Sequence, residues 1–244
     1  MKIALIGYGA MGKIVERLAV ERGHEIAGVL GSGELGLSEQ EIAAVLEGSD
    51  VAIDFTVAEA VRRNVEAAVI AKVPIVVGTT GWNEQRQEIE DVVKSGNGAM
   101  VFGANFSIGV NLFYRIVEFA TELFAEFPEY EVFIEEQHHS RKKDAPSGTA
   151  LQLRDIVEAS LSKRADEGVR VPVASTRAGN IPGTHRVGFD GPADQILLEH
   201  SARSREGFAS GAILAAEWIV GKTGVFDFSE IVSEVVEVRE INHR

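Results

Sequence analysis

The chain has 244 residues, no cysteine, and 24 Lys and Arg against 37 Asp and Glu, which gives a formal net charge of −13 at pH 7. This length suits one large domain or two smaller ones, the lack of cysteine excludes disulfides and cysteine–metal sites, and the acidic balance disfavours a general nucleic-acid binder. Since the apolar runs are too short to cross a bilayer and the first does not resemble a signal peptide, we expect a cytoplasmic protein that does not enter a membrane.

Short β-rich segments alternate with helical patterns in the N-terminal part of the chain. The expected strands are Lys2–Ile6, Glu25–Leu30, Val51–Phe55, Pro74–Gly78 and Ala99–Phe102. Apolar residues at helical spacing lie between the first two strands, and Val57–Ala71 and Asn83–Lys94 are also typical of helices. This alternation predicts an α/β fold with a Rossmann-type doubly wound parallel sheet.

The pattern changes after Asn105. Helices are expected at Ile108–Phe124 and around Leu153–Leu161, and strands at Tyr130–Gln137, Val171–Ala178, Thr184–Phe189 and Gln195–Arg203. These elements predict a second α+β domain built on an open mixed sheet, with an antiparallel sheet as the alternative. An apolar helix at Phe208–Val220 is expected to return to the first domain. We therefore predict a dinucleotide-binding domain at 1–107 and 207–244, and a substrate-binding and oligomerisation domain at 108–206.

A glycine-rich turn follows the first strand. It reads GYGAMG over Gly7–Gly12 and precedes a helix, which is the setting that a dinucleotide-binding turn requires. Gly7 permits the tight turn, Gly9 allows the backbone to approach a pyrophosphate, and Gly12 allows close helix–strand packing. The predicted cofactor-binding residues here are Gly7, Tyr8, Gly9, Ala10, Met11 and Gly12. The alternative is a tight turn that binds nothing.

The end of the second strand leaves the choice of cofactor open. An acidic residue is typical there in NAD-binding folds, but this strand ends in Leu30-Gly31-Ser32-Gly33, and Glu34 follows slightly late. No Arg or Lys lies nearby in the sequence to hold a 2′-phosphate. We therefore expect NADPH or NADH.

Two later segments also follow predicted strands, at the edge of the sheet where a nucleotide binds. They contribute Gly78, Thr79 and Thr80, and Gly103, Ala104, Asn105 and Phe106. Small residues and hydroxyls at these positions can face the nicotinamide ribose and carboxamide. Each segment alone is more often an ordinary turn, but their joint placement favours cofactor binding.

The densest positive charge lies in HHSRKKDAPSGT at 138–149. Ser147 is a candidate helix cap, and the N–H groups of Gly148 and Thr149 can receive a carboxylate together with a lysine and an imidazole. Histidine can also move protons near neutral pH. We expect this cluster to bind a small anionic substrate opposite the nicotinamide, although adjacent strand residues such as His138 and His139 point to opposite sides unless the strand has ended.

Two other interpretations fit this segment. A His-His-Arg-Lys-Lys loop is often solvated surface, and Pro-Ser-Gly-Thr is a common helix start. A metal site is disfavoured because no third ligand has the spacing of a known zinc motif. The prediction is that the chain holds no metal.

The string HHSRKKDAPSGTA resembles the signature of the 4-hydroxy-tetrahydrodipicolinate (dihydrodipicolinate) reductase family of the diaminopimelate–lysine pathway. The likeness covers most of the chain. GYGAMG, VAIDFT, VVGTTGW, ANFSIGVN, RAGNIPGTH and EHSARSREGFASGAILAAEW follow in the family's order. The histidine–lysine string is specific, whereas the glycine turn is not.

The resemblance implies that a nicotinamide cofactor delivers hydride to C4 of a cyclic dicarboxylate, with loss of its hydroxyl as water. It assigns proton transfer to His138 and Lys142, and substrate binding to His139, Gly148 and Thr149. It also implies a homotetramer assembled through the sheet of the second domain. Two features depart from the family pattern: Gly31 and Ser32 stand where the family has an acidic residue often followed by arginine, and the segment between the Leu151–Ser162 helix and Arg177 is shorter than in many members.

Two competing functions remain at this point. One is a related two-domain dehydrogenase that acts on another small amino or keto dicarboxylate, such as an aspartate dehydrogenase. The other is an NAD(P)-binding regulator without activity. The histidine–lysine string argues against a regulator, because a sensor needs no proton donor.

Overall fold

The computed structural model describes residues 1–31, 33, 36–163 and 169–241. Ser32 and Glu34, which bear on cofactor choice, lie outside the described residues, as does part of the short segment before Arg177. The chain forms two compact units: unit 1 comprises Met1–Ile108 and Arg205–Arg244, and unit 2 comprises Gly109–Ser204. None of the helices in the described ranges has the length and apolarity that a membrane crossing requires.

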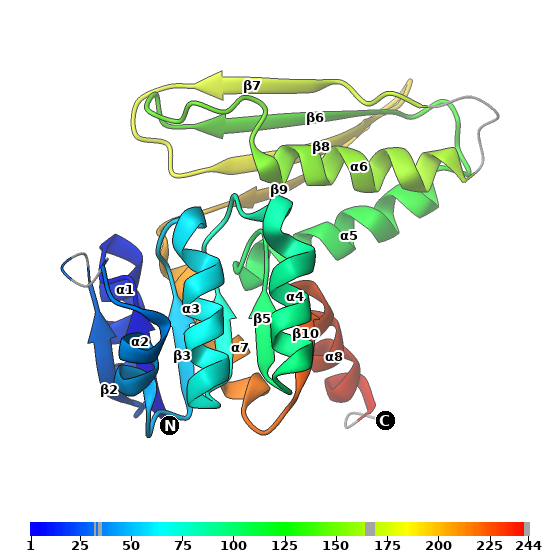
Figure 1. The fold of residues 1–244 in the computed structure, drawn as a ribbon. Coiled ribbons are helices and arrows are strands. Elements are labelled where there is room, and N and C mark those ends of the chain that lie inside the picture. Colours follow the sequence, from blue (N-terminus) through cyan, green and yellow to red (C-terminus); the bar gives the residue numbers. More distant parts are fainter. Residues whose placement is uncertain (32, 34–35, 164–168, 242–244) are drawn as a thin grey trace. The chain divides into compact units, whose positions relative to one another are not determined.

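Unit 1 is built on a six-stranded parallel sheet in the order β10-β5-β4-β3-β1-β2 (Figure 1). Its strands are β1 (Lys2–Ile6), β2 (Glu25–Leu30), β3 (Val51–Asp54), β4 (Ile75–Val77), β5 (Ala99–Phe102) and β10 (Gly224–Asp227). Every neighbouring pair is parallel. The predicted Rossmann-type doubly wound sheet is therefore confirmed.

Helices cover both faces of this sheet, because the inner strands are apolar on both sides. The helices of unit 1 are α1 (Ala10–Glu21), α2 (Glu39–Leu46), α3 (Ala58–Ala71), α4 (Arg86–Ser95), α7 (Glu206–Ile219) and α8 (Phe228–Ile241), with a short 3₁₀ turn at Asn83–Gln85. The apolar cluster on one face includes residues of α1, α7 and α8, and the cluster on the other includes residues of α2, α3 and α4.

The apolar helix expected at Phe208–Val220 is α7, and it belongs to unit 1. Four alanines of α7 are fully buried, and a Cβ on Gly211 would lie 1.7 Å from the carbonyl oxygen of Phe106. Small residues therefore let α7 pack closely against the segment that follows β5. The sequence did not indicate α2, β10 or α8, of which α2 begins at a capping box formed by Ser38 and Glu41.

Unit 2 contains a four-stranded sheet in the order β7-β6-β8-β9. Its strands are β6 (Glu131–His138), β7 (Val173–Arg177), β8 (Thr184–Asp190) and β9 (Gln195–Ser201), and its helices are α5 (Ile108–Phe124) and α6 (Gly148–Ser162). Strands β6 and β7 are parallel, while β6–β8 and β8–β9 are antiparallel. The sheet is therefore mixed, as predicted.

The core of unit 2 lies between this sheet and the two helices. Phe113 and Val117 of α5 and Leu153 and Val157 of α6 pack against inward residues of β6 and β8. Along β6 the buried positions are Val132, Ile134, Glu136 and His138. The buried face of β6 is therefore apolar at its first two positions and ionisable at its last two. The ionisable side chains at the end of the strand are shielded from solvent.

Candidate active site

The glycine turn of unit 1 has the geometry that close approach of a phosphate requires. Gly7 has φ +94°, and a Cβ there would lie 2.3 Å from the carbonyl oxygen of Phe55. A Cβ on Gly12 would lie 2.2 Å from the oxygen of Gly7, so α1 packs directly on the turn. Gly9 caps α1 and has no atom within 4 Å of the position of its missing Cβ. The turn therefore leaves open space in front of a helix N-terminus, which fits a pyrophosphate.

The other side chains of this turn face different surroundings. Tyr8 donates to Glu16, and Met11 packs against the apolar cluster beneath α1. Ala10 is exposed at the first turn of α1. A contact with a dinucleotide at these positions would therefore come mainly from the backbone.

The strand ends at β4 and β5 are partly occupied by internal contacts. The Thr79 hydroxyl donates to Asp54 across 2.9 Å, and Asp54 is fully buried with further donors from Thr56 and Asn64. Burial raises the pKa of Asp54, whereas these hydrogen bonds oppose the rise. The hydroxyl expected to face a cofactor thus holds the end of β3 to the end of β4.

The remaining predicted cofactor residues differ in exposure. Thr80 and Ala104 are exposed, Gly78 and Asn105 are half-buried, and Gly103 is buried. Phe106 is 2% exposed, and its ring lies 4.7 Å from that of Phe228, so its side chain belongs to the core. A role in cofactor binding remains a prediction for each of them.

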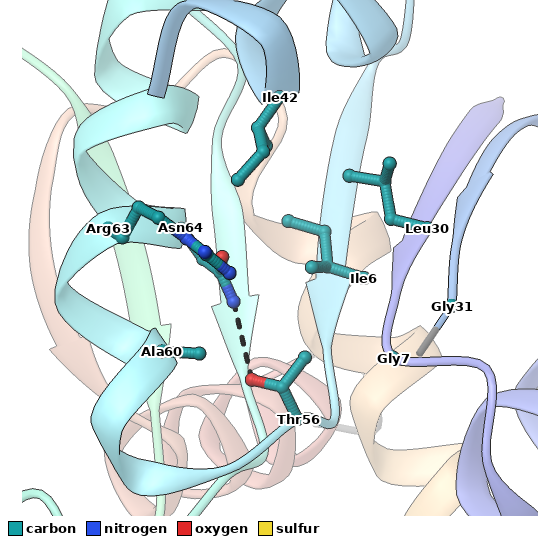
Figure 2. A pocket seen from close by; sticks show the side chains of 9 residues that line it. All are labelled: Ile6, Gly7, Leu30, Gly31, Ile42, Thr56, Ala60, Arg63 and Asn64. Atoms are coloured by element: carbon teal, nitrogen blue, oxygen red, sulfur yellow. Dashed lines mark hydrogen bonds between the residues drawn. The ribbon is translucent and has the colours of Figure 1, made fainter. Parts of the chain in front are cut away.

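A pocket lies in unit 1 beside the glycine turn (Figure 2). It is lined by Ile6, Gly7, Leu30, Gly31, Ile42, Thr56, Ala60, Arg63 and Asn64. The ends of β1 and β2 form one side and α3 forms another, and the Arg63 side chain extends from α3 into the space between them. Arg63 lies far from Gly31 in the sequence, so no local motif indicated that the two meet.

In unit 2, His138 is held by a buried carboxylate. Its Nδ1 contacts the carboxylate of Glu136, which is 1% exposed and also accepts from Arg177 Nη2 at 2.6 Å. An ionised carboxylate only accepts, so the imidazole proton sits on Nδ1 and Nε2 is left to face other groups. Gly183 makes room there, since a Cβ at that position would lie 3.1 Å from Nε2.

A second histidine, His185, lies opposite Glu136 in the β6–β8 pair. Its Nε2 is 3.1 Å from the Ser147 hydroxyl, which in turn accepts from the N–H of Ala150. Ser147 is therefore the cap of α6, as predicted. The N–H of Ser147 also points to Glu136 at 3.3 Å, which ties the start of α6 to the carboxylate.

The predicted lysine lies in the loop that joins β6 to α6. Lys142 Nζ is 2.9 Å from Asp144 Oδ1, and the lysine side chain is 25% exposed. The backbone oxygen of Asp144 accepts from Arg177 at 2.6 Å, so the loop is fixed to the end of β7. His139, Gly148 and Thr149 follow the strand end or open α6, with His139 half-buried, Gly148 exposed and Thr149 half-buried.

The electrostatics of this cluster favour neutral histidines and an ionised carboxylate. Burial lowers the pKa of His138, and Lys142 and Arg177 lower it further, while Glu136 opposes them. Burial also lowers the pKa of His185 to about 4. Burial alone would raise the pKa of Glu136, but hydrogen bonds from Arg177, Ser175 and His138 hold the pKa of this carboxyl below its usual value.

Glu136, His138 and His185 also form a group whose ligand atoms lie within 4.8 Å of one another. Such a set can bind a divalent cation. Here, however, the guanidinium of Arg177 pairs with Glu136, and its positive charge opposes a cation at the same carboxylate. The donor set fits proton transfer better than metal binding.

Sequence reasoning missed four residues of these sites: Arg63, Glu136, Arg177 and His185. Of these four, Glu136 is the one that local sequence could have indicated. It lies two positions before His138 on a strand, so the two side chains point to the same face. Arg177 and His185 come from later strands, and only the pairing of β7 and β8 with β6 brings them to the cluster.

Models of one family match both parts of the chain. The model described as dihydrodipicolinate reductase, N-terminus, matches residues 1–106, and the model of its C-terminus matches residues 109–232. A 4-hydroxy-tetrahydrodipicolinate reductase of Christiangramia forsetii is 36% identical and is matched over 96% of this chain and 99% of its own length. One of Archaeoglobus fulgidus is also 36% identical, over 95% of this chain and all of its own.

Solved structures show the same fold. A dipicolinate-bound dihydrodipicolinate reductase from Paenisporosarcina sp. TG-14 has a TM-score of 0.73 at 23% identity and covers 93% of this chain and 97% of that one. A myo-inositol dehydrogenase from Sinorhizobium meliloti, described as putative, has a TM-score of 0.59 at 12% identity, with 92% of each chain covered.

Proposed function

The chain belongs to the dihydrodipicolinate reductase family, and on that premise we propose that it reduces 4-hydroxy-tetrahydrodipicolinate to tetrahydrodipicolinate in the diaminopimelate route to lysine. One hydride and one proton enter the substrate, and its hydroxyl leaves as water. One arrangement supports this reaction most directly: the buried pair of His138 and Glu136 beside the start of α6. It combines a proton-transfer group with an anion-binding helix end.

The substrate is a dicarboxylate, and unit 2 offers groups suited to its two carboxylates. The first turn of α6 presents the N–H groups of Gly148 and Thr149, which intrahelical hydrogen bonds cannot use. His139 and Lys142 add side chains that donate to a carboxylate. Asp144 neutralises Lys142 before substrate arrives, so a substrate carboxylate would compete with Asp144 for the ammonium group.

We assign proton transfer to His138 and Lys142. Hydride addition leaves electron density on the substrate that a proton must neutralise, and a nearby imidazolium or ammonium group can supply it. Glu136 stabilises the protonated form of His138 and fixes the orientation of its ring. The pKa of His138 is lowered in the folded chain, so Glu136 alone does not keep its ring protonated. The negative charge of the bound substrate, together with that of Glu136, would favour the protonated ring.

Unit 1 would hold the nicotinamide cofactor, NADPH or NADH, which supplies the hydride when bound. The open space in front of Gly9 and the free N-terminus of α1 support this assignment. Gly7–Gly12 would bind the pyrophosphate through backbone N–H groups. The strand-end residues Gly78–Thr80 and Gly103–Phe106 complete the proposed cofactor set.

We further propose a homotetramer assembled through the sheet of unit 2. The face of this sheet opposite α5 and α6 carries Phe133, Gly188 and Leu197 in register across three strands. The Leu197 side chain is 46% exposed in the single chain. Light scattering of the purified protein measures the assembly directly, and a monomeric mass would contradict it.

The activity is tested by supplying the product of dihydrodipicolinate synthase together with NADPH or NADH. We expect the reduced nicotinamide to be oxidised and tetrahydrodipicolinate to form. The oxidation is measured as a loss of the near-ultraviolet absorbance of the reduced cofactor. A control with aspartate or oxaloacetate and ammonia tests the aspartate dehydrogenase alternative. The proposed function would be contradicted if the folded protein bound NADPH or NADH but oxidised neither in the presence of the product of dihydrodipicolinate synthase.

A further inference from the structure

Arg177 contacts both of the residues that hold the proposed proton-transfer groups. It is the last residue of β7 and lies beside His138, the last residue of β6, in the parallel register of these neighbouring strands (Figure 1). Its Nη2 donates to Glu136 Oε1 and to the backbone oxygen of Asp144, each at 2.6 Å. One nitrogen therefore uses its two N–H groups on two different segments of unit 2.

Each of these two contacts leads on to a proton-transfer group. Glu136 contacts Nδ1 of the His138 ring through its second oxygen. The Asp144 carboxylate pairs with Lys142 Nζ at 2.9 Å. One continuous series of contacts therefore joins five residues: His138, Glu136, Arg177, Asp144 and Lys142. The two groups to which we assign proton transfer are linked through a single guanidinium at the centre of this series.

The guanidinium also balances the charge of these residues. Burial opposes the charge of Glu136, yet hydrogen bonds, with that of Arg177 the largest, keep its pKa below the usual value. Hydrogen bonding to Lys142 does the same for the pKa of Asp144. Two carboxylates are thus balanced by two cations while the imidazole of His138 is neutral. Without Arg177 the series would carry a net negative charge, which would repel a dicarboxylate substrate.

We infer that Arg177 is a positioning residue of the reaction, which holds His138 and Lys142 in place relative to each other through Glu136 and Asp144. The inference rests on the proposed function, because it assumes that these two residues transfer protons to one substrate. Arg177 acts through its two acceptors rather than on the reacting atoms. Its loss should therefore affect both proton-transfer groups at once.

The loop that carries Lys142 has further ties to the turn that follows β7. The N–H of Ser140 donates to the oxygen of Gly179 at 3.2 Å, and Arg141 Nη1 donates to Asn180 Oδ1 at 3.0 Å. These contacts join the same loop to the same turn without involving the acidic residues. Arg141→Gln is therefore a matched control, because it removes a contact of an arginine between these segments and leaves both acidic residues in place.

Steady-state kinetics with the product of dihydrodipicolinate synthase test the positioning role. Arg177→Gln should lower kcat by roughly ten- to a hundredfold, because both proton-transfer groups lose their fixed places, and it should raise KM because a cation is lost. Arg177→Lys should restore KM but only part of kcat, because it keeps the charge and not the planar geometry. Arg141→Gln should keep both constants. An equal loss in Arg141→Gln and Arg177→Gln would overturn the inference.

A double-mutant cycle separates positioning from a general effect on the fold. If Arg177 acts by placing Lys142, Arg177→Gln should cost much less in kcat/KM in a protein that already carries Lys142→Met. Independent effects add, so additive losses would overturn the inference. If removal of a buried charge unfolds Arg177→Gln, as circular dichroism would show, Arg177→Lys takes its place in the cycle, and an unchanged kcat in that variant would overturn the inference.

The ring of His138 reports on Arg177 without any turnover. Burial lowers the pKa of His138, the charges of Lys142 and Arg177 lower it further, and Glu136 raises it. The His185 ring, 5.1 Å away between centroids, is itself kept neutral by burial at neutral pH. Removal of the Arg177 charge should therefore raise the pKa of His138.

NMR titration of the histidine rings in the unliganded protein measures this shift. The pKa of His138 should rise in Arg177→Gln and stay nearly unchanged in Arg177→Lys and Arg141→Gln. The same ring pKa in Arg177→Gln and the unaltered protein would overturn the inference. Failure of the unaltered protein to oxidise a reduced nicotinamide would instead overturn the proposed function, whereas full activity in a folded Arg177→Gln variant would overturn the inference alone.

Discussion

Arg177 donates to the Glu136 carboxylate across 2.6 Å and thereby joins the ends of two parallel strands, β7 and β6. Both side chains are largely withdrawn from water, at 17% and 0% exposure. The carboxylate is held ionised by this pair and by the N–H groups around it, and His138 lies against its second oxygen. The buried ion pair therefore fixes the position of one imidazole ring. A strand end with a purely structural role would not need such a pair.

Glu136→Gln is expected to lower kcat/KM by roughly a hundredfold, because the amide cannot stabilise the imidazolium of His138. The carboxylate raises the pKa of His138, so its loss should lower that pKa. The alkaline limb of the pH–rate profile should then move to lower pH. Glu135→Gln, on the opposite face of β6, is the control, since Glu135 pairs with Arg186 at 3.7 Å. If the alkaline limb of the pH–rate profile stays at the same pH in Glu136→Gln, Glu136 acts on stability alone.

Lys142→Met should lower kcat/KM by roughly a hundredfold or more, because it removes a donor to the substrate and a candidate proton source. The affinity for NADPH or NADH, measured by calorimetry, should stay the same, since Lys142 belongs to unit 2. Lys143→Met is the matched control, as Lys143 is an exposed lysine of the same loop. Equal turnover in the two variants would remove Lys142 from the proposed mechanism.

Two glycine variants separate folding from nucleotide binding in unit 1. Gly12→Ala should destabilise the protein, because its Cβ would lie 2.2 Å from the oxygen of Gly7. Gly9→Ala should retain the melting temperature, since nothing lies within 4 Å of the new methyl group, yet weaken dinucleotide binding by at least about tenfold. Unchanged affinity in Gly9→Ala would place the pyrophosphate elsewhere.

His185 should make the protein sensitive to acid. Its pKa falls from 6.5 to about 4 in the folded chain, so the unfolded chain binds the proton more tightly. Stability from this residue is present above pH 6.5 and declines as the pH falls toward 4, by up to about 3 kcal/mol. In urea unfolding across this range, His185→Asn should show a shallower decline. A parallel decline in both proteins would exclude His185 as the cause.

Several features of this protein follow from local sequence. The alternation of apolar strands and helices predicts the doubly wound sheet, because parallel strands need crossover helices and are apolar on both faces. GYGAMG predicts the turn and Pro-Ser-Gly-Thr the cap of α6, because both depend on backbone conformations that only certain residues favour. The short α2 and the edge strand β10 escaped prediction because neither has a long apolar period.

The chemistry of the two sites depends on contacts between residues far apart in the chain. His138 and Lys142 were indicated by their motif, but their partners Arg177 and His185 reach the cluster only through the registers of β7 and β8 with β6. Likewise Arg63 meets the end of β2 only because α3 packs beside that edge of the sheet. Sequence alone determined the fold class and the glycine turn, and it indicated the histidine–lysine string proposed for proton transfer, since each is encoded within short stretches of the chain. Tertiary structure decided which charges meet, because strand pairing and helix packing, rather than sequence distance, set the separations over which electrostatic interactions act.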